Sequence, residues 1–199
     1  AETVKSLTVN PSFIGFTKGL RAFVYLNLLN PLDTFLTHIP WWYTMSIFAA
    51  IGYFTVGLRF AFITVLLLFF IAACGIWTQS MVTLSSVLVS VALCFALGVP
   101  LGIIASYNKR FRDIQNVILD AMQTLPYFCY LIPVLMFFGG GIVSAVLATV
   151  IYAIPPIIRL TSLGLTQVSG SFSEVSRSFG GTLLQTLSKV KFPLAVPSL

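Results

Sequence analysis

Residues 60–108 read FAFITVLLLFFIAACGIWTQSMVTLSSVLVSVALCFALGVPLGIIASYN and contain no Asp, Glu, Lys or Arg. Two further runs, 34–58 and 121–158, are also free of these four residue types. About 20 consecutive apolar residues are enough for a helix to cross the hydrocarbon core of a bilayer. Each of the three runs is longer than that, so the sequence predicts a chain that crosses a membrane several times.

The overall composition excludes an ordinary soluble domain. Hydrophobic residues make up 58% of the chain and charged residues 8%, whereas soluble domains carry about 25% charged residues. A small domain cannot hide so much apolar surface in its own core, so membrane lipid is the predicted surroundings. The net charge of +6 is assigned to cytoplasmic loops and not to nucleic-acid binding. The three cysteines have none of the paired spacings of metal sites.

The apolar runs divide into five predicted helices within residues 41–165, so the predicted fold class is an all-α, polytopic transmembrane helix bundle. Their expected limits are 41–58, 60–77, 81–106, 114–138 and 142–160. Trp41, Trp42 and Tyr43 form an aromatic belt at the start of the first span. The glycine run 139–141 turns the chain between the last two. Prolines inside the spans are tolerated where neighbouring groups satisfy the freed carbonyls.

Residues 1–40 form a separate N-terminal segment of mixed character. Apolar side chains recur at helical spacing over residues 13–25, with basic residues on the opposite face. Two interpretations remain open, namely an amphipathic helix in the membrane interface and a helix packed on the body of the same protein. The pair Asn30-Pro31 predicts a break after this helix.

The basic residues predict the orientation of the chain. If the first span begins outside, eight Lys and Arg residues from Arg59 to Lys191 fall on the cytoplasmic side, and the turns near Thr78 and Gly140 carry none. The opposite orientation would violate the positive-inside rule. The prediction is a multi-pass protein of the cytoplasmic (inner) membrane, with its N-terminus outside and the loop after the fifth span inside.

Residues 166–195 form the sizeable cytoplasmic loop of this scheme and contain two predicted capping boxes. Ser171 precedes Glu174 by three residues, and a second such pair begins at Thr182. Each pair can satisfy the unpaired amides at the start of a helix, and Gly180 between them suits the conformation that ends a helix. The pattern predicts two short helices joined by a turn at Gly180. Such a helix pair would offer a separate ATPase a surface to bind.

The same loop carries residues at a fixed spacing. Three residues separate Ser176 from Gly180, and nine residues separate Gly180 from Val190. This spacing resembles the EAA loop of ABC importer permeases, whose pattern is Glu-Ala-Ala, three residues, Gly, nine residues, then Ile-x-Leu-Pro. By that resemblance the residues that couple to the ATPase are Glu174, Val175, Ser176, Gly180, Val190, Phe192 and Pro193. Ser176 is the one polar departure from the pattern, a mild change at a helix contact.

Further strings narrow the resemblance to the permeases of glycine betaine/proline (quaternary ammonium) transport. They are WTQSMVTL at 77–84, LDAMQT at 119–124, PPIIRLT at 155–161 and SRSFG at 176–180. The resemblance implies a type I ABC importer fold, a permease homodimer, a cytoplasmic ATP-binding subunit and an extracytoplasmic substrate-binding protein. It also implies a chain that is not an enzyme and holds no cofactor, because the partner subunit binds ATP.

The predicted function is therefore the permease subunit of an ATP-driven importer of compatible solutes such as glycine betaine. The alternatives are a permease for choline, carnitine or an amino acid, and a membrane scaffold outside the ABC class. Secondary transporters usually keep carboxylates or histidines in their spans, and here only Asp120 lies in one. A membrane-embedded enzyme is disfavoured because the single His and the five acidic residues are scattered along the chain.

Aromatic residues around the fourth and fifth spans are candidates for a substrate path. Tyr127, Tyr130 and Tyr152, together with Phe128, could contact a permeating quaternary ammonium through cation–π interactions. Packing within the bundle is the alternative role for these rings. Residues 196–199 read as the start of a further helix, so the sequence is expected to be a C-terminally truncated fragment.

Overall fold

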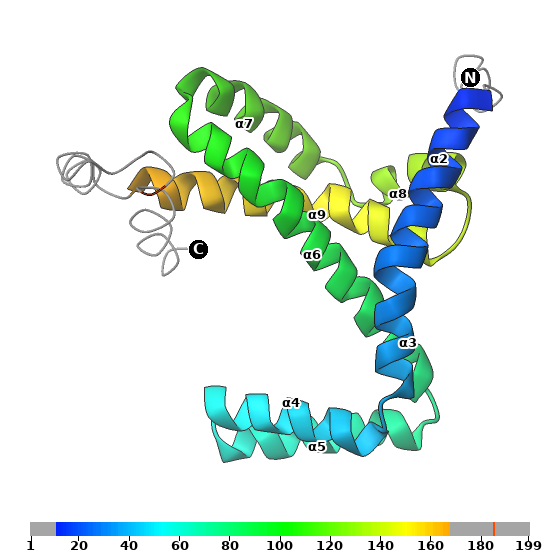
Figure 1. The fold of residues 1–199 in the computed structure, drawn as a ribbon. Helices are drawn as coiled ribbons and strands as arrows, with labels where there is room; N and C mark the ends of the chain where they lie inside the picture. Colours follow the sequence, from blue (N-terminus) through cyan, green and yellow to red (C-terminus); the bar gives the residue numbers. More distant parts are fainter. Residues whose placement is uncertain (1–10, 168–184, 186–199) are drawn as a thin grey trace. The chain divides into compact units, whose positions relative to one another are not determined.

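The computed structural model describes residues 11–167 and residue 185, with side chains from residue 15 onward. All elements in this part are helices (Figure 1). They fall into two compact units, and each is described by itself. Unit 1 comprises Ala1–Val89 and Gly140–Val146, and unit 2 comprises Ser90–Gly139 and Leu147–Leu199.

Unit 1 begins with an uninterrupted helical segment, so the predicted break at Asn30-Pro31 is wrong. The segment consists of α2 (Pro11–Phe23), the π-helix η1 (Val24–Leu29) and α3 (Asn30–His38). In the π-helical turn the Asn30 amide donates to the Tyr25 carbonyl, five residues back. This wider turn accommodates the proline ring, which in an α-helix clashes with the carbonyl four residues earlier. The helix ends instead before Pro40, because the preceding Ile39 is extended, with ψ at 132°.

The next two helices, α4 (Trp41–Thr55) and α5 (Leu58–Ala73), pack against each other as a hairpin in unit 1 (Figure 1). A Cβ atom at Gly52 would lie 3.0 Å from the Phe60 ring, so the glycine permits this close approach. Both helices begin near the start of their predicted spans, 41–58 and 60–77. They end earlier than predicted, at Thr55 and Ala73. At ~1.5 Å per residue, helices of 15 and 16 residues are shorter than a hydrocarbon core of ~30 Å.

By length and composition, two of the described helices can cross a membrane, namely α6 (Trp77–Tyr107) and α9 (Ile142–Gln167). Each extends past its predicted limits of 81–106 or 142–160. The glycine turn before α9 holds Gly139 and Gly141 at φ values of 75° and 134°, a region that favours glycine. Helices α7 (Lys109–Thr124) and α8 (Phe128–Phe138) can make a third span only if the bent pair counts as one.

The predicted span over 114–138 forms two helices in the structure and not one. These are α7 (Lys109–Thr124) and α8 (Phe128–Phe138), and their axes are bent by 94°. Pro126 disfavours helical geometry at the residue before it, and Leu125 is extended with ψ at 134°. The proline therefore divides the segment instead of adding a kink to one helix.

Within unit 2, α6 and α9 pack closely at two glycines spaced four residues apart on α6. A Cβ atom at Gly98 would lie 2.8 Å from Ile157 Cγ2, and one at Gly102 would lie 2.6 Å from Thr161 Cβ. Small residues at this spacing let two helix backbones approach closely in membranes. Because Gly98 meets Ile157 and Gly102 meets Thr161, these parts of the two helices run parallel. The contact fixes α9 beside α6 in the half that leads to Gln167.

Candidate functional site

Three aromatic rings gather where α7 and α8 meet in unit 2. The centroid of the Tyr127 ring lies 3.9 Å from that of Phe128 and 6.4 Å from that of Tyr152 on α9. The three residues remain 56–57% exposed, so they are not sealed in a core. We call this group the aromatic corner (Tyr127, Phe128 and Tyr152).

Of the three tyrosines predicted to line a substrate path, the structure brings two together. Tyr127 and Tyr152 meet at the aromatic corner. Tyr130 is half-buried, and its hydroxyl donates to the Met122 carbonyl near the end of α7. Tyr130 therefore holds α8 against α7 across the break, while Phe128 supplies the third ring of the corner.

The aromatic corner has the geometry for contact with a cation. The faces of aromatic rings are negative, and a cation is attracted when it lies within about 6 Å of a ring centroid. The Tyr127 and Tyr152 centroids are 6.4 Å apart, so a cation beside the pair can lie within this distance of both. Because the rings are exposed, a cation can approach them from the open side of the corner.

An ion pair that the sequence did not predict joins α7 to α9. Arg159 Nη2 on α9 donates to Asp120 Oδ1 on α7 over 2.6 Å, and the two side chains are 34% and 65% exposed. Polar side chains in membrane proteins commonly face other helices and pair with each other. Asp120, as the single acidic residue of its predicted span, indicates that a basic partner lies nearby. The sequence does not show which basic residue is that partner.

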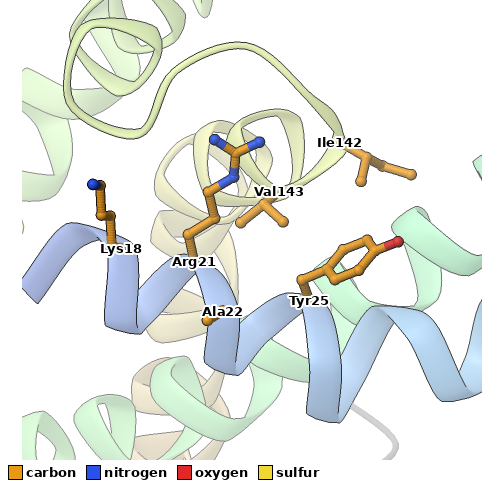
Figure 2. Close-up of a pocket in the computed structure, with 6 residues that line it drawn as sticks. All are labelled: Lys18, Arg21, Ala22, Tyr25, Ile142 and Val143. Atoms are coloured by element: carbon orange, nitrogen blue, oxygen red, sulfur yellow. The ribbon is translucent and has the colours of Figure 1, made fainter. Parts of the chain in front are cut away.

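A cavity of about 320 Å³ lies in unit 1, lined by Lys18, Arg21, Ala22, Tyr25, Ile142 and Val143. Figure 2 shows Arg21 reaching from α2 toward the turn before α9, with Lys18 one helical turn earlier. Arg21 Nη2 donates to the Gly140 carbonyl over 3.3 Å. This bond joins α2 to the turn within unit 1, while Phe16 and Phe23 of α2 stay exposed.

The predicted coupling residues of the EAA loop, from Glu174 to Pro193, lie outside the described residues. The described part of the chain contains no group of three or more His, Cys, Asp or Glu residues placed to hold a metal ion.

Comparison with known proteins identifies the family. Residues 98–199 match the family described as the binding-protein-dependent transport system inner membrane component. The chain belongs to this family. It is a multi-pass helical component of the inner membrane and the permease part of an ABC transporter, distinct from the ATPase. The family, the all-helical fold class and the permease role predicted from the sequence are thereby confirmed.

Several relatives of this permease carry names that state a solute. The glycine betaine/proline betaine permease of Escherichia coli (strain K12) is 43% identical over 172 residues, 86% of this chain. The glycine betaine permease of Bacillus subtilis (strain 168) is 40% identical over 98% of this chain. The trimethylamine N-oxide permease of Ruegeria pomeroyi is 33% identical over 92% of it. The alignments cover 49%, 67% and 28% of those proteins, so the chain spans about half of the Escherichia coli relative.

Proposed function

We propose that this permease forms the membrane path of an ATP-driven importer of glycine betaine and similar compatible solutes. The solutes named for the three relatives share a nitrogen with four bonds and no hydrogen, bonded to four carbons in the betaines and to three carbons and one oxygen in trimethylamine N-oxide. Such a nitrogen carries positive charge and cannot donate a hydrogen bond, so an aromatic face is a suitable partner for it. The observation that carries the proposal is the pair of exposed rings at Tyr127 and Tyr152.

The position of the aromatic corner supports a role in the path. Transporters commonly place their binding sites where a helix is interrupted, because unwound backbone and helix ends are available there. The interruption between α7 and α8 immediately precedes Tyr127. We propose that the permeating ammonium group passes along the exposed side of the Tyr127–Tyr152 pair, with Tyr130 in a supporting role through its bond to Met122.

The proposal includes the partners of the intact transporter. An extracytoplasmic binding protein would deliver the solute, two permeases would form a homodimer, and a cytoplasmic ATP-binding subunit would grip the EAA loop. Glu174, Gly180 and Pro193 would anchor that grip. The family description supports the binding protein, since it is given as binding-protein-dependent. In this scheme the N-terminus lies outside and the loop inside, as the basic residues predict.

The experiment is uptake of radiolabelled glycine betaine by vesicles that contain the full-length parent permease with its ATPase and binding protein. We expect ATP-dependent uptake, and we expect Tyr127→Ala and Tyr152→Ala each to lower the rate about 2- to 30-fold, equivalent to a cation–π contact of ~0.5–2 kcal/mol. Phenylalanine at either position should preserve uptake, because the ring and not the hydroxyl makes the contact.

The matched control is Tyr53→Ala, which removes a tyrosine of similar exposure (53%) from α4 and should leave uptake unchanged. Wild-type rates in both corner alanine variants would rule out the aromatic path while leaving the transport function standing. Uptake of a metal ion or a sugar, without competition from glycine betaine, would rule out the solute class.

A further inference from the structure

A second cavity, in unit 2, is lined by groups that donate hydrogen bonds. Its volume is about 220 Å³, and its lining residues are Arg112, Asn116, Asp120, Arg159, Ser162 and Leu163. We call it the polar pocket. Its members come from α7 and α9, the two elements joined by the Asp120–Arg159 ion pair.

The spacing of residues on α7 explains how the pocket forms. Arg112, Asn116 and Asp120 are each four residues apart, so they lie on one face of the helix, and this face lines the pocket with α9. The opposite face carries Ile114 and Ile118, which are 64% and 56% exposed. A helix that turns its polar face toward a neighbour and its apolar face outward has the pattern of a membrane-embedded helix.

Several donors in the polar pocket have no acceptor among the described residues. The Ser162 side chain is 5% exposed, and neither its Oγ atom nor the buried Nε of Arg159 has a partner there. Arg112 and Asn116 are half-buried, and the structure gives their side chains no hydrogen bond within the described part of the chain. A buried donor without an acceptor costs about 1–3 kcal/mol. The arrangement therefore calls for a small ligand that is rich in acceptors.

The charges of the residues that line the polar pocket further restrict the class of ligand. The lining holds two guanidinium groups, on Arg112 and Arg159, and one carboxylate, on Asp120, so its net charge is one positive unit. Arginine forks match the oxygens of phosphate. A volume of about 220 Å³ is below the ~300–1,000 Å³ of pockets for drug-sized molecules, so a single phosphate group suits it better than a larger solute.

We propose that the polar pocket binds a phosphate oxyanion, held by Arg112, Arg159 Nε and the Ser162 hydroxyl. Two sources supply this chemistry, namely inorganic phosphate from solution and the phosphodiester of an anionic lipid headgroup. Basic pockets between membrane helices are known as a type of headgroup site, and the exposed apolar face of α7 favours nearby lipid. The bound oxyanion would tie α7 to α9 beside the ion pair.

The experiment measures the thermal unfolding midpoint of the purified full-length parent permease in two arms. In the first arm inorganic phosphate is titrated against chloride at equal ionic strength in detergent. In the second arm the protein is placed in phosphatidylcholine nanodiscs with and without phosphatidylglycerol. We expect the midpoint to rise in at least one arm. A response to phosphate identifies the soluble anion, and a response to phosphatidylglycerol alone identifies the headgroup.

Variants test whether the rise in the unfolding midpoint comes from binding in the polar pocket. Arg112→Gln and Ser162→Ala should each need at least about tenfold more ligand for the same rise, which is the effect of losing a hydrogen bond to a charged group. Arg110→Gln is the matched control, because it removes the same charge from the same helix at a position outside the pocket lining. Ser162→Ala removes one oxygen atom, so it reads out the site even if Arg112→Gln fails to fold. No response in either arm, or an equal response in all four proteins, overturns the proposal.

Discussion

Arg159 on α9 and Asp120 on α7 form an ion pair of 2.6 Å. Tyr127, seven residues after Asp120, contacts Tyr152, seven residues before Arg159. The residue numbers rise on one side as they fall on the other, so the two segments run antiparallel. Seven helical residues are about two turns. The α7–α8 break and the middle of α9 are therefore held in one register by an ionic contact and an aromatic contact.

The ion pair should contribute measurable coupling between α7 and α9. In a double-mutant cycle of Asp120→Asn and Arg159→Gln, we expect a coupling free energy of roughly 0.5–1 kcal/mol, because both side chains are partly exposed. The measurement is the unfolding free energy of the full-length permease in detergent. The control cycle combines Asp113→Asn with Arg159→Gln, and we expect a coupling free energy of zero for that pair. A coupling of zero for Asp120 and Arg159 would contradict this contact.

Gly102 should be sensitive to the addition of one methyl group. A Cβ atom there would lie 2.6 Å from Thr161 Cβ and 2.8 Å from the Ile158 carbonyl, so Gly102→Ala must push α6 and α9 apart. We expect a loss of about 1–3 kcal/mol in stability, seen as a lower unfolding midpoint. Gly19→Ala is the control, since nothing lies within 4 Å of that Cβ position. Equal midpoints for the two variants would disprove the close packing.

The predicted orientation can be tested with cysteine labelling. Cys74 is exposed at the end of α5, and the orientation places it outside. In a permease carrying Cys94→Ala and Cys129→Ala, a membrane-impermeant maleimide should label intact spheroplasts. In a variant without the three native cysteines, Lys109→Cys should react only after permeabilisation. The reverse pattern would invert the assigned topology.

Coupling to the ATPase is expected to depend on Gly180. The predicted turn requires a backbone conformation that costs other residues roughly 1–2 kcal/mol, and a coupling helix that is misplaced by about 1 Å can cost orders of magnitude in rate. Gly180→Val should abolish uptake while the protein stays inserted in the membrane, as judged by protein level and cysteine labelling. Gly15→Val, on the surface of α2, is the control. Normal uptake by well-expressed Gly180→Val would remove the coupling role.

The sequence predicted α6 and α9 because an apolar run without charges has few alternatives in a membrane. It failed at residues 125–127, where a proline inside an apolar run fits both a kinked helix and a broken one. The choice depends on contacts such as the bond from Tyr130 to Met122, which links residues across the break. Composition and spacing do not contain such a contact.

The same limit applies to the candidate site. Tyr127 and Tyr130 were predicted together because each offers an aromatic face to a cation. In the structure the Tyr127 ring contacts Tyr152, whereas the Tyr130 hydroxyl donates to the Met122 carbonyl. The ion pair of Asp120 and Arg159 joins residues 39 positions apart, and five acids and eleven bases offer many pairings on sequence alone.

The double proline of α9 gives that helix uneven stiffness. Pro155 and Pro156 lie inside α9 and have no amide hydrogen, so the carbonyls four residues earlier, including that of Tyr152, lack their helical donors. The half toward Gln167 is clamped by Gly102 and by Asp120, whereas Tyr152 lies on the other side of the weakened turn. We therefore expect α9 to bend at this turn. A movement of the Gln167 end would then change the distance between the Tyr127 and Tyr152 rings.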